Sequence, residues 1–254
     1  MPDDVDETAS QDLPNEPRAV PGTNCPVVGI GASAGGIDAL RHLLPNVDPS
    51  CSFAFIVVLH LDPDHKSFLA DVIGRSTSLP VVQIKDRMAV ESGHIYVIPP
   101  NAGLNIHDGR LLLTPPTALR GQRNVIDEFF TSLARDQGEK AACVILSGTG
   151  SDGTIGLRAI KENGGLTIAQ LEAEYDGMMR NAVSTGLVDF VLRVEEIPAK
   201  LADYFGRLNN GKREETPSSD PVDYLGPITA LLRARTGHDF SNYKERTIAR
   251  RVQR

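Results

Sequence analysis

The chain has no tryptophan, few aromatic residues, no excess of basic charge and no apolar run of membrane-spanning length. Aromatic residues make up 5% of its 254 residues, and 26 Lys and Arg stand against 33 Asp and Glu, a formal net charge of −7. A dedicated nucleic-acid-binding protein normally has a basic balance, so we expect no nucleic-acid partner. A membrane-spanning helix needs about 20 consecutive apolar residues, and a signal peptide needs an apolar segment near the start. Neither pattern occurs, so the sequence predicts a cytoplasmic protein without membrane insertion.

Cysteine is scarce as well. The three cysteines are Cys25, Cys51 and Cys143, an odd number without a CxxC spacing. A disulfide framework or a cysteine-rich zinc site would need more cysteines at closer intervals. We therefore expect reduced thiols.

The apolar residues, 41% of the chain, fall into runs that alternate between strand and helix patterns. Continuous apolar runs such as residues 52–59 are typical of strands buried on both faces of a parallel sheet. The predicted strands are residues 27–30, 52–59, 81–84, 141–146, 166–169 and 188–192. The predicted helices are residues 36–44, 66–73, 125–135, 154–161, 179–184 and 197–205. This alternation predicts an α/β fold, a doubly wound and mostly parallel sheet with helices on both faces.

The middle of the chain has a different pattern. Residues 94–98 and 111–113 are mostly apolar and flank the Asp108-Gly109 pair, which is a hairpin signal. We expect an antiparallel hairpin at an edge of the sheet.

Composition predicts four segments. Residues 1–22 are acidic, rich in proline and without apolar periodicity, which indicates a disordered tail. Residues 23–207 form the α/β domain, and residues 208–222 are a polar linker with glycine and proline. Residues 223–254 form a short helical segment that looks truncated, since a helical pattern runs to the last residue. The arginines near its end form either a solvated face or a contact with an acidic partner.

The stretch GIGASAGG, residues 29–36, joins the first predicted strand to the first predicted helix. A glycine-lined turn at a helix start lets backbone N–H groups approach a bound group, and the helix dipole favours negative charge there. The turn would either cradle a nucleotide phosphate or present Ser33 as a nucleophile. A dinucleotide site requires the spacing GxGxxG and an acidic residue at the end of the next strand, where this chain has His60. The nucleophile is therefore the favoured interpretation.

Ser33, His60 and Asp152 each follow a predicted strand, and the ends of parallel strands meet at one rim of a sheet. Serine, histidine and aspartate as nucleophile, general base and orienting group define a serine hydrolase. The backbone N–H groups of Ala34 and of residues 147–150 are candidate oxyanion donors. Each residue also has a structural alternative. Ser33 and Asp152 would cap the helices that follow them, and His60 would be an ordinary hydrogen-bonded histidine.

A metal site is a rival hypothesis. The stretch HLDPDH, residues 60–65, is one substitution away from the HxHxDH pattern of metallo-hydrolases. A zinc site of that kind needs further histidines, for which His94 and His107 are the candidates. Neither lies at an obvious rim position, so we expect no metal. The alternative is a turn that caps the next helix.

Several spaced motifs together resemble the CheB-type protein-glutamate methylesterases of chemotaxis. They are GIGASAGG at residues 29–36, VLH at 58–60, IYVIPP at 95–100, Ile126-Asp127, LSGTGSDG at 146–153, LTIAQ at 166–170 and Gly177-Met178. The resemblance covers about residues 25–207. It implies hydrolysis of glutamate γ-methyl esters on chemoreceptors with release of methanol, deamidation of receptor glutamines, and no cofactor.

The resemblance assigns the catalytic triad to Ser33, His60 and Asp152. Residues that match family positions near the cleft are the candidate oxyanion and substrate-binding residues Ala34, Thr149, Gly150, Gln170, Glu172 and Met178. Many members have threonine in place of Ala34 and methionine in place of Thr149. Backbone donors survive such changes, whereas side-chain contacts to the ester would differ.

The last residues carry a second resemblance. Residues 231–254 are similar to the start of the helical amino-terminal domain of CheR-type receptor methyltransferases. This resemblance implies the front part of a methylesterase–methyltransferase fusion, in which a downstream methyltransferase domain of the same polypeptide is a partner. It implies no methyltransferase activity in this segment itself. The rival function is a non-catalytic regulatory scaffold within such a sensory fusion, because the family's receiver domain is absent and the loop residues Ala34 and Thr149 are altered.

Overall fold

A computed structural model of the protein describes residues 25–59, 69–115 and 124–209. The strands are β1 Val27–Ala32, β2 Ala54–Leu59, β3 Val81–Gln83, β4 Met88–Ala89, β5 Ile95–Val97, β6 Gly103–His107, β7 Arg110–Thr114, β8 Ala141–Ile145, β9 Leu166–Gln170 and β10 Phe190–Leu192. The helices are α1 Gly36–Leu43, α2 Leu69–Gly74, α3 Val125–Gln137, α4 Thr154–Glu162, α5 Gly177–Ser184 and α6 Ile197–Asn209, with short 3₁₀ turns at Leu44–Asn46 and Gly138–Lys140. The chain divides into two compact units, Met1–Phe205 and Gly206–Arg254.

Seven strands form one parallel sheet in the order β10-β9-β8-β1-β2-β5-β3. Along the chain, β2, β3 and β5 come first and lie on one side of β1. The later strands β8, β9 and β10 lie on the other side of β1. The strand order therefore reverses between β1 and β8, which is a topological switch point. This confirms the predicted doubly wound, mostly parallel sheet.

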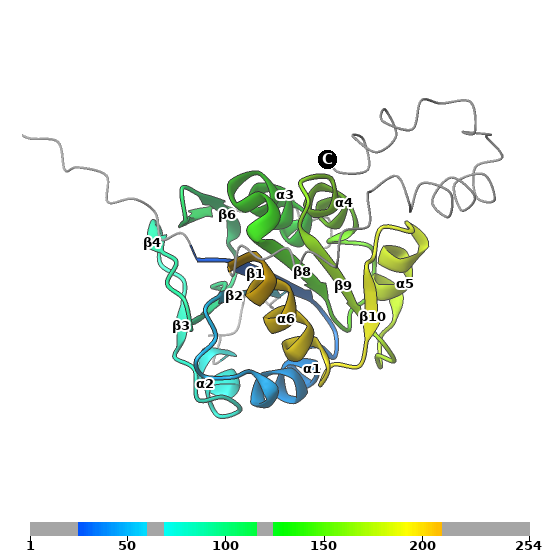
Figure 1. Ribbon diagram of the computed structural model, residues 1–254, viewed down its shortest axis with the longest axis horizontal. Coiled ribbons are helices and arrows are strands. Elements are labelled where there is room, and N and C mark those ends of the chain that lie inside the picture. The colour runs from blue at the N-terminus through cyan, green and yellow to red at the C-terminus, as the bar shows by residue number, and fades with distance from the viewer. Residues whose placement is uncertain (1–24, 60–68, 116–123, 210–254) are drawn as a thin grey trace, which may run out of the picture. The chain divides into compact units, whose positions relative to one another are not determined.

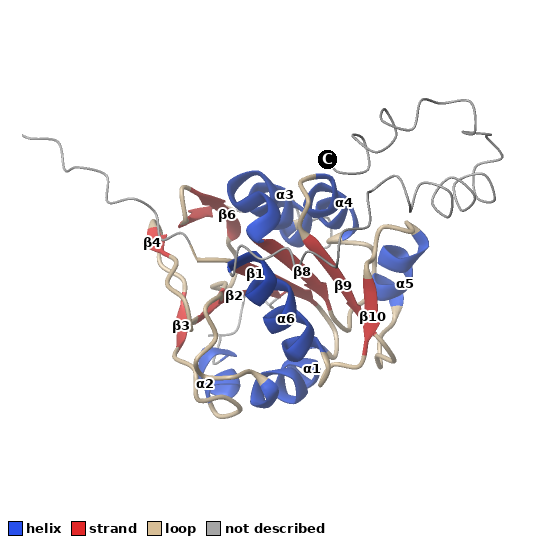
Figure 2. Cartoon of the chain, viewed as in Figure 1, coloured by secondary structure: helices blue, strands red, loops and turns tan. Residues whose placement is uncertain are grey.

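Helices cover both faces of the sheet (Figures 1 and 2). On one face α3 packs against β1 and α4 lies beside α3. On the other face Phe205 of α6 packs on Phe53, with ring centroids 5.0 Å apart, and Phe53 meets Phe55 of β2 edge-on. Burial on both faces explains why β1, β2 and β8 are apolar along their whole length.

The hairpin prediction is confirmed, but the predicted place of the hairpin is wrong. β6 and β7 pair antiparallel around Asp108 and Gly109, both of which have positive φ. They join β4 in a separate three-stranded sheet instead of extending the main sheet. Contacts with α3 hold the hairpin there, since the Ile106 N–H donates to Ser132 Oγ at 3.1 Å.

Residues 94–98 were expected to belong to the antiparallel edge, and this too is wrong. β5 lies inside the main sheet, parallel to both β2 and β3. Its residues Ile95, Tyr96 and Val97 are all buried, as in a strand covered on both faces. A short apolar run of this kind is compatible with either position, so periodicity alone could not decide between them.

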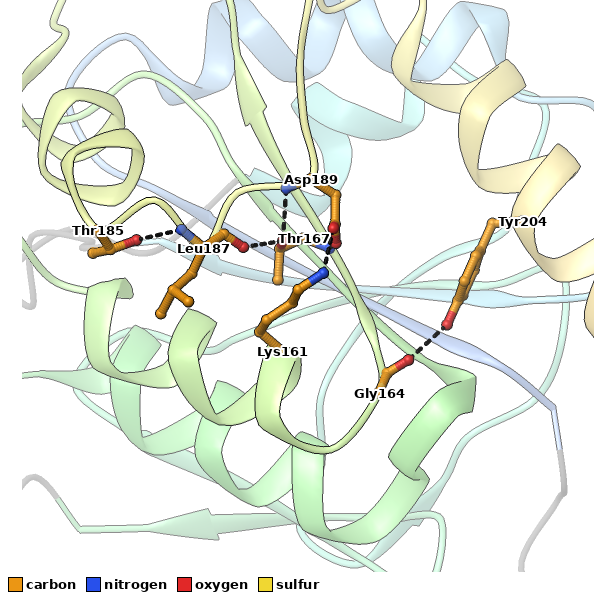
Figure 3. A network of polar contacts seen from close by, with 7 residues as sticks. All are labelled: Lys161, Gly164, Thr167, Thr185, Leu187, Asp189 and Tyr204. Carbon is orange, nitrogen blue, oxygen red and sulfur yellow. Dashed lines mark hydrogen bonds and ion pairs between the residues drawn. The ribbon is translucent and has the colours of Figure 1, made fainter. Parts of the chain in front are cut away.

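A polar network braces the amino ends of β9 and β10 (Figure 3). The buried Thr167 hydroxyl donates to the Leu187 carbonyl at 2.7 Å and accepts from the Asp189 N–H at 3.0 Å. Lys161 pairs with the Asp189 carboxylate, and the Tyr204 hydroxyl lies 3.2 Å from the Gly164 carbonyl oxygen. Burial is the main cause that raises the pKa of Tyr204 to about 12. This network ties α4 and α6 to the rim opposite the carboxyl ends of the strands.

Two expectations from composition can be compared with the described residues. No disulfide joins the three cysteines, of which Cys143 is buried within β8. In the three described ranges, no helix combines the length and the apolar character needed to cross a membrane.

Candidate active site

The candidate site lies where β1 and β8 end, at the switch point of the sheet. β1 ends at Ala32, and the N–H of the next residue, Ser33, donates to the carbonyl of Ser147 at 3.0 Å. In the register of the sheet, Ala32 is opposite Leu59, the last residue of β2. His60 follows Leu59 in the sequence but lies outside the described residues, as does the rest of the HLDPDH stretch. In open α/β sheets, ligands bind in the crevice at such a reversal of strand order.

Ser33 is half-buried, and its side chain does not cap α1. The helix is preceded by Gly35 in the left-handed conformation, with φ of 74°, and no side chain bonds to its first turn. Only the Ser33 backbone takes part, because its carbonyl accepts from the Gly36 N–H at 3.0 Å. Within the described part of the chain, the Ser33 hydroxyl makes no hydrogen bond. The capping alternative for this serine is therefore wrong.

Two glycines of the GIGASAGG motif lie in the strand and not in the turn. A Cβ atom at Gly29 would lie 2.8 Å from the Phe130 ring, and one at Gly31 would lie 2.5 Å from Ile126 Cγ2. Both neighbours belong to α3, so these glycines let α3 pack closely on β1. Their placement argues against a phosphate cradle, because only Gly35 and Gly36 remain at the turn.

The loop after β8 is held beside Ser33 by a side chain that the sequence analysis did not single out. The Ser147 hydroxyl donates to the Ala34 carbonyl at 2.9 Å and accepts from the Tyr175 N–H at 3.2 Å. The Gly148 N–H donates to the Tyr175 carbonyl at 2.9 Å. Ser147 thus joins the Ser33 turn to the segment before α5. The only sequence signal for it is a polar residue directly after a buried strand.

Gly148 brings the loop into close contact with Ser33. A Cβ atom at Gly148 would lie 3.0 Å from Ser33 Cβ and 2.1 Å from the sulfur of Met178. Met178 is fully buried, and its N–H donates to the Gly148 carbonyl at 2.9 Å. The structure therefore brings Ser33, Gly148 and Met178 together, with Met178 as support behind the loop.

The expected oxyanion donors differ in whether they already have acceptors. The Ser147 N–H donates to Gln170 Oε1 at 3.0 Å, and the Gly148 N–H is bonded to Tyr175. Among the described residues, the N–H groups of Ala34, Thr149 and Gly150 have no acceptor. Thr149 and Gly150 are exposed, so these three donors are the ones left to meet a ligand.

Gln170 and Glu172 lie at the end of β9. The Gln170 side chain is buried, and its amide group bridges the Ser147 N–H and the Glu172 carbonyl, the latter at 3.4 Å. Glu172 is exposed and has a φ of 57°. The contacts of Gln170 give it a part in shaping the loop after β8.

Asp152 is buried, with 8% of its surface exposed, and it caps a helix other than the one expected. Its Oδ2 accepts from the Ile126 N–H at 3.1 Å and its Oδ1 from the Asp127 N–H at 2.9 Å. Both donors belong to the first turn of α3. The alternative in which Asp152 caps the helix starting at Thr154 is therefore wrong, because the N-cap residue of that helix, α4, is Gly153 and no side chain caps it.

Asp127 of α3 contacts both Asp152 and α4, the first through its backbone N–H and the second through its side chain. Its Oδ1 accepts from the Gly156 N–H in the first turn of α4 at 2.8 Å. Burial, followed by the neighbouring charge of Asp152, raises the pKa of Asp127 to about 6, against an ordinary 3.8. The sequence analysis noted Asp127 as part of a motif without assigning it a role.

The histidines proposed to complete a metal site lie apart from this rim. His94 precedes β5, at the amino ends of the parallel strands, where its ring stacks on Tyr96. His107 ends β6 in the separate sheet, 3.4 Å from the Asp108 carboxylate. Neither can join ligands at the carboxyl ends of β1 and β8.

Comparison with known proteins gives one consistent family. The family model described as CheB methylesterase matches residues 28–201. In the crystal structure of the Thermotoga maritima CheB methylesterase catalytic domain, the similar region covers 70% of this chain and 98% of that one, with a TM-score of 0.64 and 28% identity.

Sequence relatives differ mainly in length. A putative protein-glutamate methylesterase/protein-glutamine glutaminase of Leptospira interrogans is 32% identical over 76% of this chain and 99% of its own. Protein-glutamate methylesterase/protein-glutamine glutaminase 2 of Pseudomonas aeruginosa is 33% identical over 74% of this chain and 55% of its own. An uncharacterized 104.1 kDa protein of Rhodobacter capsulatus is 34% identical over 73% of this chain, which spans only 22% of that protein. With the fold, the switch-point site and the matching family model in agreement, the chain belongs to the CheB methylesterase family.

Proposed function

We propose that the chain is a serine hydrolase that removes methyl groups from glutamate γ-methyl esters of chemoreceptors or related signalling proteins. The observation that carries the proposal is Ser33, which follows a central strand at the switch point with its hydroxyl unbonded among the described residues. Family membership supports the ester substrate, since relatives are named protein-glutamate methylesterases. The same relatives are named protein-glutamine glutaminases, so we include deamidation of glutamine side chains.

In the proposed reaction, Ser33 Oγ bonds to the ester carbonyl carbon while His60 accepts the hydroxyl proton. The carbonyl oxygen becomes an oxyanion, for which the Ala34 N–H and the N–H groups of Thr149 and Gly150 are the candidate donors. His60 then returns the proton to the departing methoxy oxygen, and methanol leaves. Water, deprotonated by His60, releases the glutamate from Ser33 and restores the hydroxyl.

Asp152 has the third role in this proposal, to orient His60 and stabilise its protonated form. Its two bonds from α3 N–H groups hold the carboxylate in one orientation, and the positive end of the helix dipole favours its negative charge. Gln170 and Met178 support the loop on the other side of Ser33. We assign Thr149 and Glu172, both exposed, to the surface that meets the methylated segment.

The decisive test is methanol release from a methylated receptor fragment. We expect Ser33→Ala to lower turnover by at least about a thousandfold while the protein stays folded, because the nucleophile is lost. Ser33→Ala and His60→Ala combined should cost little more than either alone. Full activity in Ser33→Ala would contradict the mechanism, and binding of the receptor fragment without any turnover by the wild type would favour a scaffold function.

We also propose the domain division. The catalytic domain comprises residues 23–207, which the family match at residues 28–201 and the compact unit ending at Phe205 both support. Residues 1–22 are a tail, residues 208–222 a linker, and residues 223–254 the start of a methyltransferase-type helical domain. The relative of 104.1 kDa, most of which lies outside the match, supports the occurrence of this domain in longer polypeptides.

A further inference from the structure

The first turns of α3 and α4 are capped by carboxylates from across the interface between the two helices. The turn of α3 has no bond from its own N-cap side chain, and instead Asp152, from the loop before α4, accepts from Ile126 and Asp127. The turn of α4 likewise has no side-chain cap, and Asp127 of α3 accepts from Gly156. The orphan N–H groups of two helices are thus satisfied across the helix interface.

Asp127 takes part in both halves of this arrangement. Its backbone N–H binds the Asp152 carboxylate at 2.9 Å, and its own carboxyl binds the Gly156 N–H at 2.8 Å. Since Gly156 lies in the helical turn that follows Asp152, the two hydrogen bonds of Asp127 join both ends of the segment from Asp152 to Gly156 into a hydrogen-bonded ring. Both carboxyl groups are buried, with 7% of Asp127 and 8% of Asp152 exposed.

Close packing leaves this ring little freedom. A Cβ atom at Gly156 would lie 2.4 Å from Phe130 Cβ and 3.0 Å from the Asp127 carbonyl oxygen. One at Gly153, where φ is 93°, would lie 2.9 Å from Ile126 Cγ2. The two glycines therefore allow the start of α4 to lie directly on the start of α3, at the distance that the carboxylate bonds require.

We propose that Asp127 is a positioning residue, which fixes the orientation of the Asp152 carboxylate by anchoring the first turn of α4 to α3. The inference rests on the proposed function, in which Asp152 orients His60. Without the Asp127 carboxyl, the Gly156 N–H loses its acceptor, the segment from Asp152 to Gly156 gains freedom, and Asp152 no longer holds one orientation. A displacement of about 1 Å in such a group can cost up to about a hundredfold in rate.

The test compares three variants with the wild type in methanol release and in hydrogen exchange of the Ile126 amide. We expect Asp127→Ala to lower kcat about tenfold or more with KM little changed, and Asp127→Asn to restore most of kcat because its amide oxygen can still accept from Gly156. Asp136→Ala is the matched control, with the same change at the other end of α3, and should keep the wild-type kcat. If Asp127→Ala does not fold, Asp127→Glu replaces it, since its longer side chain displaces the carboxylate and should also lower kcat.

A folded Asp127→Ala or Asp127→Glu with wild-type kcat would overturn the proposal, and so would an Asp127→Asn as impaired as the alanine variant. Hydrogen exchange separates this outcome from failure of the proposed function. If the wild type releases no methanol, the methylesterase proposal fails, but the Ile126 amide, which donates to Asp152, should still exchange about tenfold faster in Asp127→Ala than in the wild type. Unchanged exchange at Ile126 would reject the positioning role independently of any activity.

Discussion

The residues around Ser33 fix its position mainly through their size and their hydrogen bonds. Gly148 shows this most clearly, since its missing side chain allows the loop after β8 to lie against Ser33 Cβ and the sulfur of Met178. Ser147, next to it, uses its hydroxyl to hold the Ser33 turn and the segment before α5 in one arrangement. The position of the nucleophile therefore depends on neighbours that do no chemistry themselves.

We predict that Gly148→Ala lowers kcat by about tenfold or more. The Met178 sulfur can shift aside, but Ser33 Cβ is tied to β1 and must move with the backbone that carries the nucleophile. The measurement is methanol release together with thermal unfolding. Gly206→Ala in α6, where a Cβ atom would meet nothing within 4 Å, is the control and should leave kcat unchanged. Wild-type kcat in a folded Gly148→Ala would show that the loop has more room than the structure indicates.

At the scale of elements, the candidate site and the polar network lie at opposite rims of the sheet. The carboxyl ends of β1, β8 and β9 carry the candidate site, whereas the amino ends of β9 and β10 carry the network around Thr167 and Asp189 (Figure 3). This network links α4 and α6 to the sheet through Lys161 and Tyr204. We interpret it as a stabilising device remote from the chemistry.

Thr167→Val tests that interpretation. The substitution keeps the shape of the buried side chain but removes the donor to the Leu187 carbonyl and one of the two acceptors of the Asp189 N–H, which also donates to the Thr167 carbonyl at 3.0 Å. We expect the free energy of unfolding to fall by about 1–3 kcal/mol, measured by denaturant titration, while kcat per folded molecule stays at the wild-type value. A large loss of kcat without loss of stability would contradict the separation of the two rims.

At the scale of the whole molecule, the buried carboxyl of Asp127 makes stability depend on pH. Asp127 has a pKa of about 6 in the folded protein and an ordinary value of 3.8 when unfolded. Because the folded state holds the proton more tightly, protonated Asp127 stabilises the fold fully below about pH 3.8. That contribution is lost as the pH rises through about 6.

Asp127→Asn removes this titration. The free energy of unfolding of Asp127→Asn minus that of the wild type should therefore rise between about pH 4 and pH 7 and level off above. Denaturant titrations at a series of pH values measure this difference directly. A difference that is constant across the range, or that falls with pH, would mean that the charge of Asp127 is not disfavoured in the folded state.

The sequence alone determined the local elements and the residue types at the strand ends. Alternating apolar periodicities predicted α3 and α4 to within two residues at their ends, and the Asp108-Gly109 pair predicted the hairpin. These features depend on side chains a few positions apart, so they can be read from a short window of sequence. The candidate nucleophile Ser33 was found in the same way, as a polar residue at a strand end.

Only the tertiary structure decided which of these segments meet. It placed β5 inside the main sheet and the hairpin, with β4, in a separate sheet. It showed that the Asp152 carboxylate caps α3 and not α4. It also showed that Gly29 and Gly31 make room for α3. Each of these outcomes depends on groups brought together from distant parts of the chain, where packing and the satisfaction of buried N–H groups select among arrangements that the local pattern allows equally.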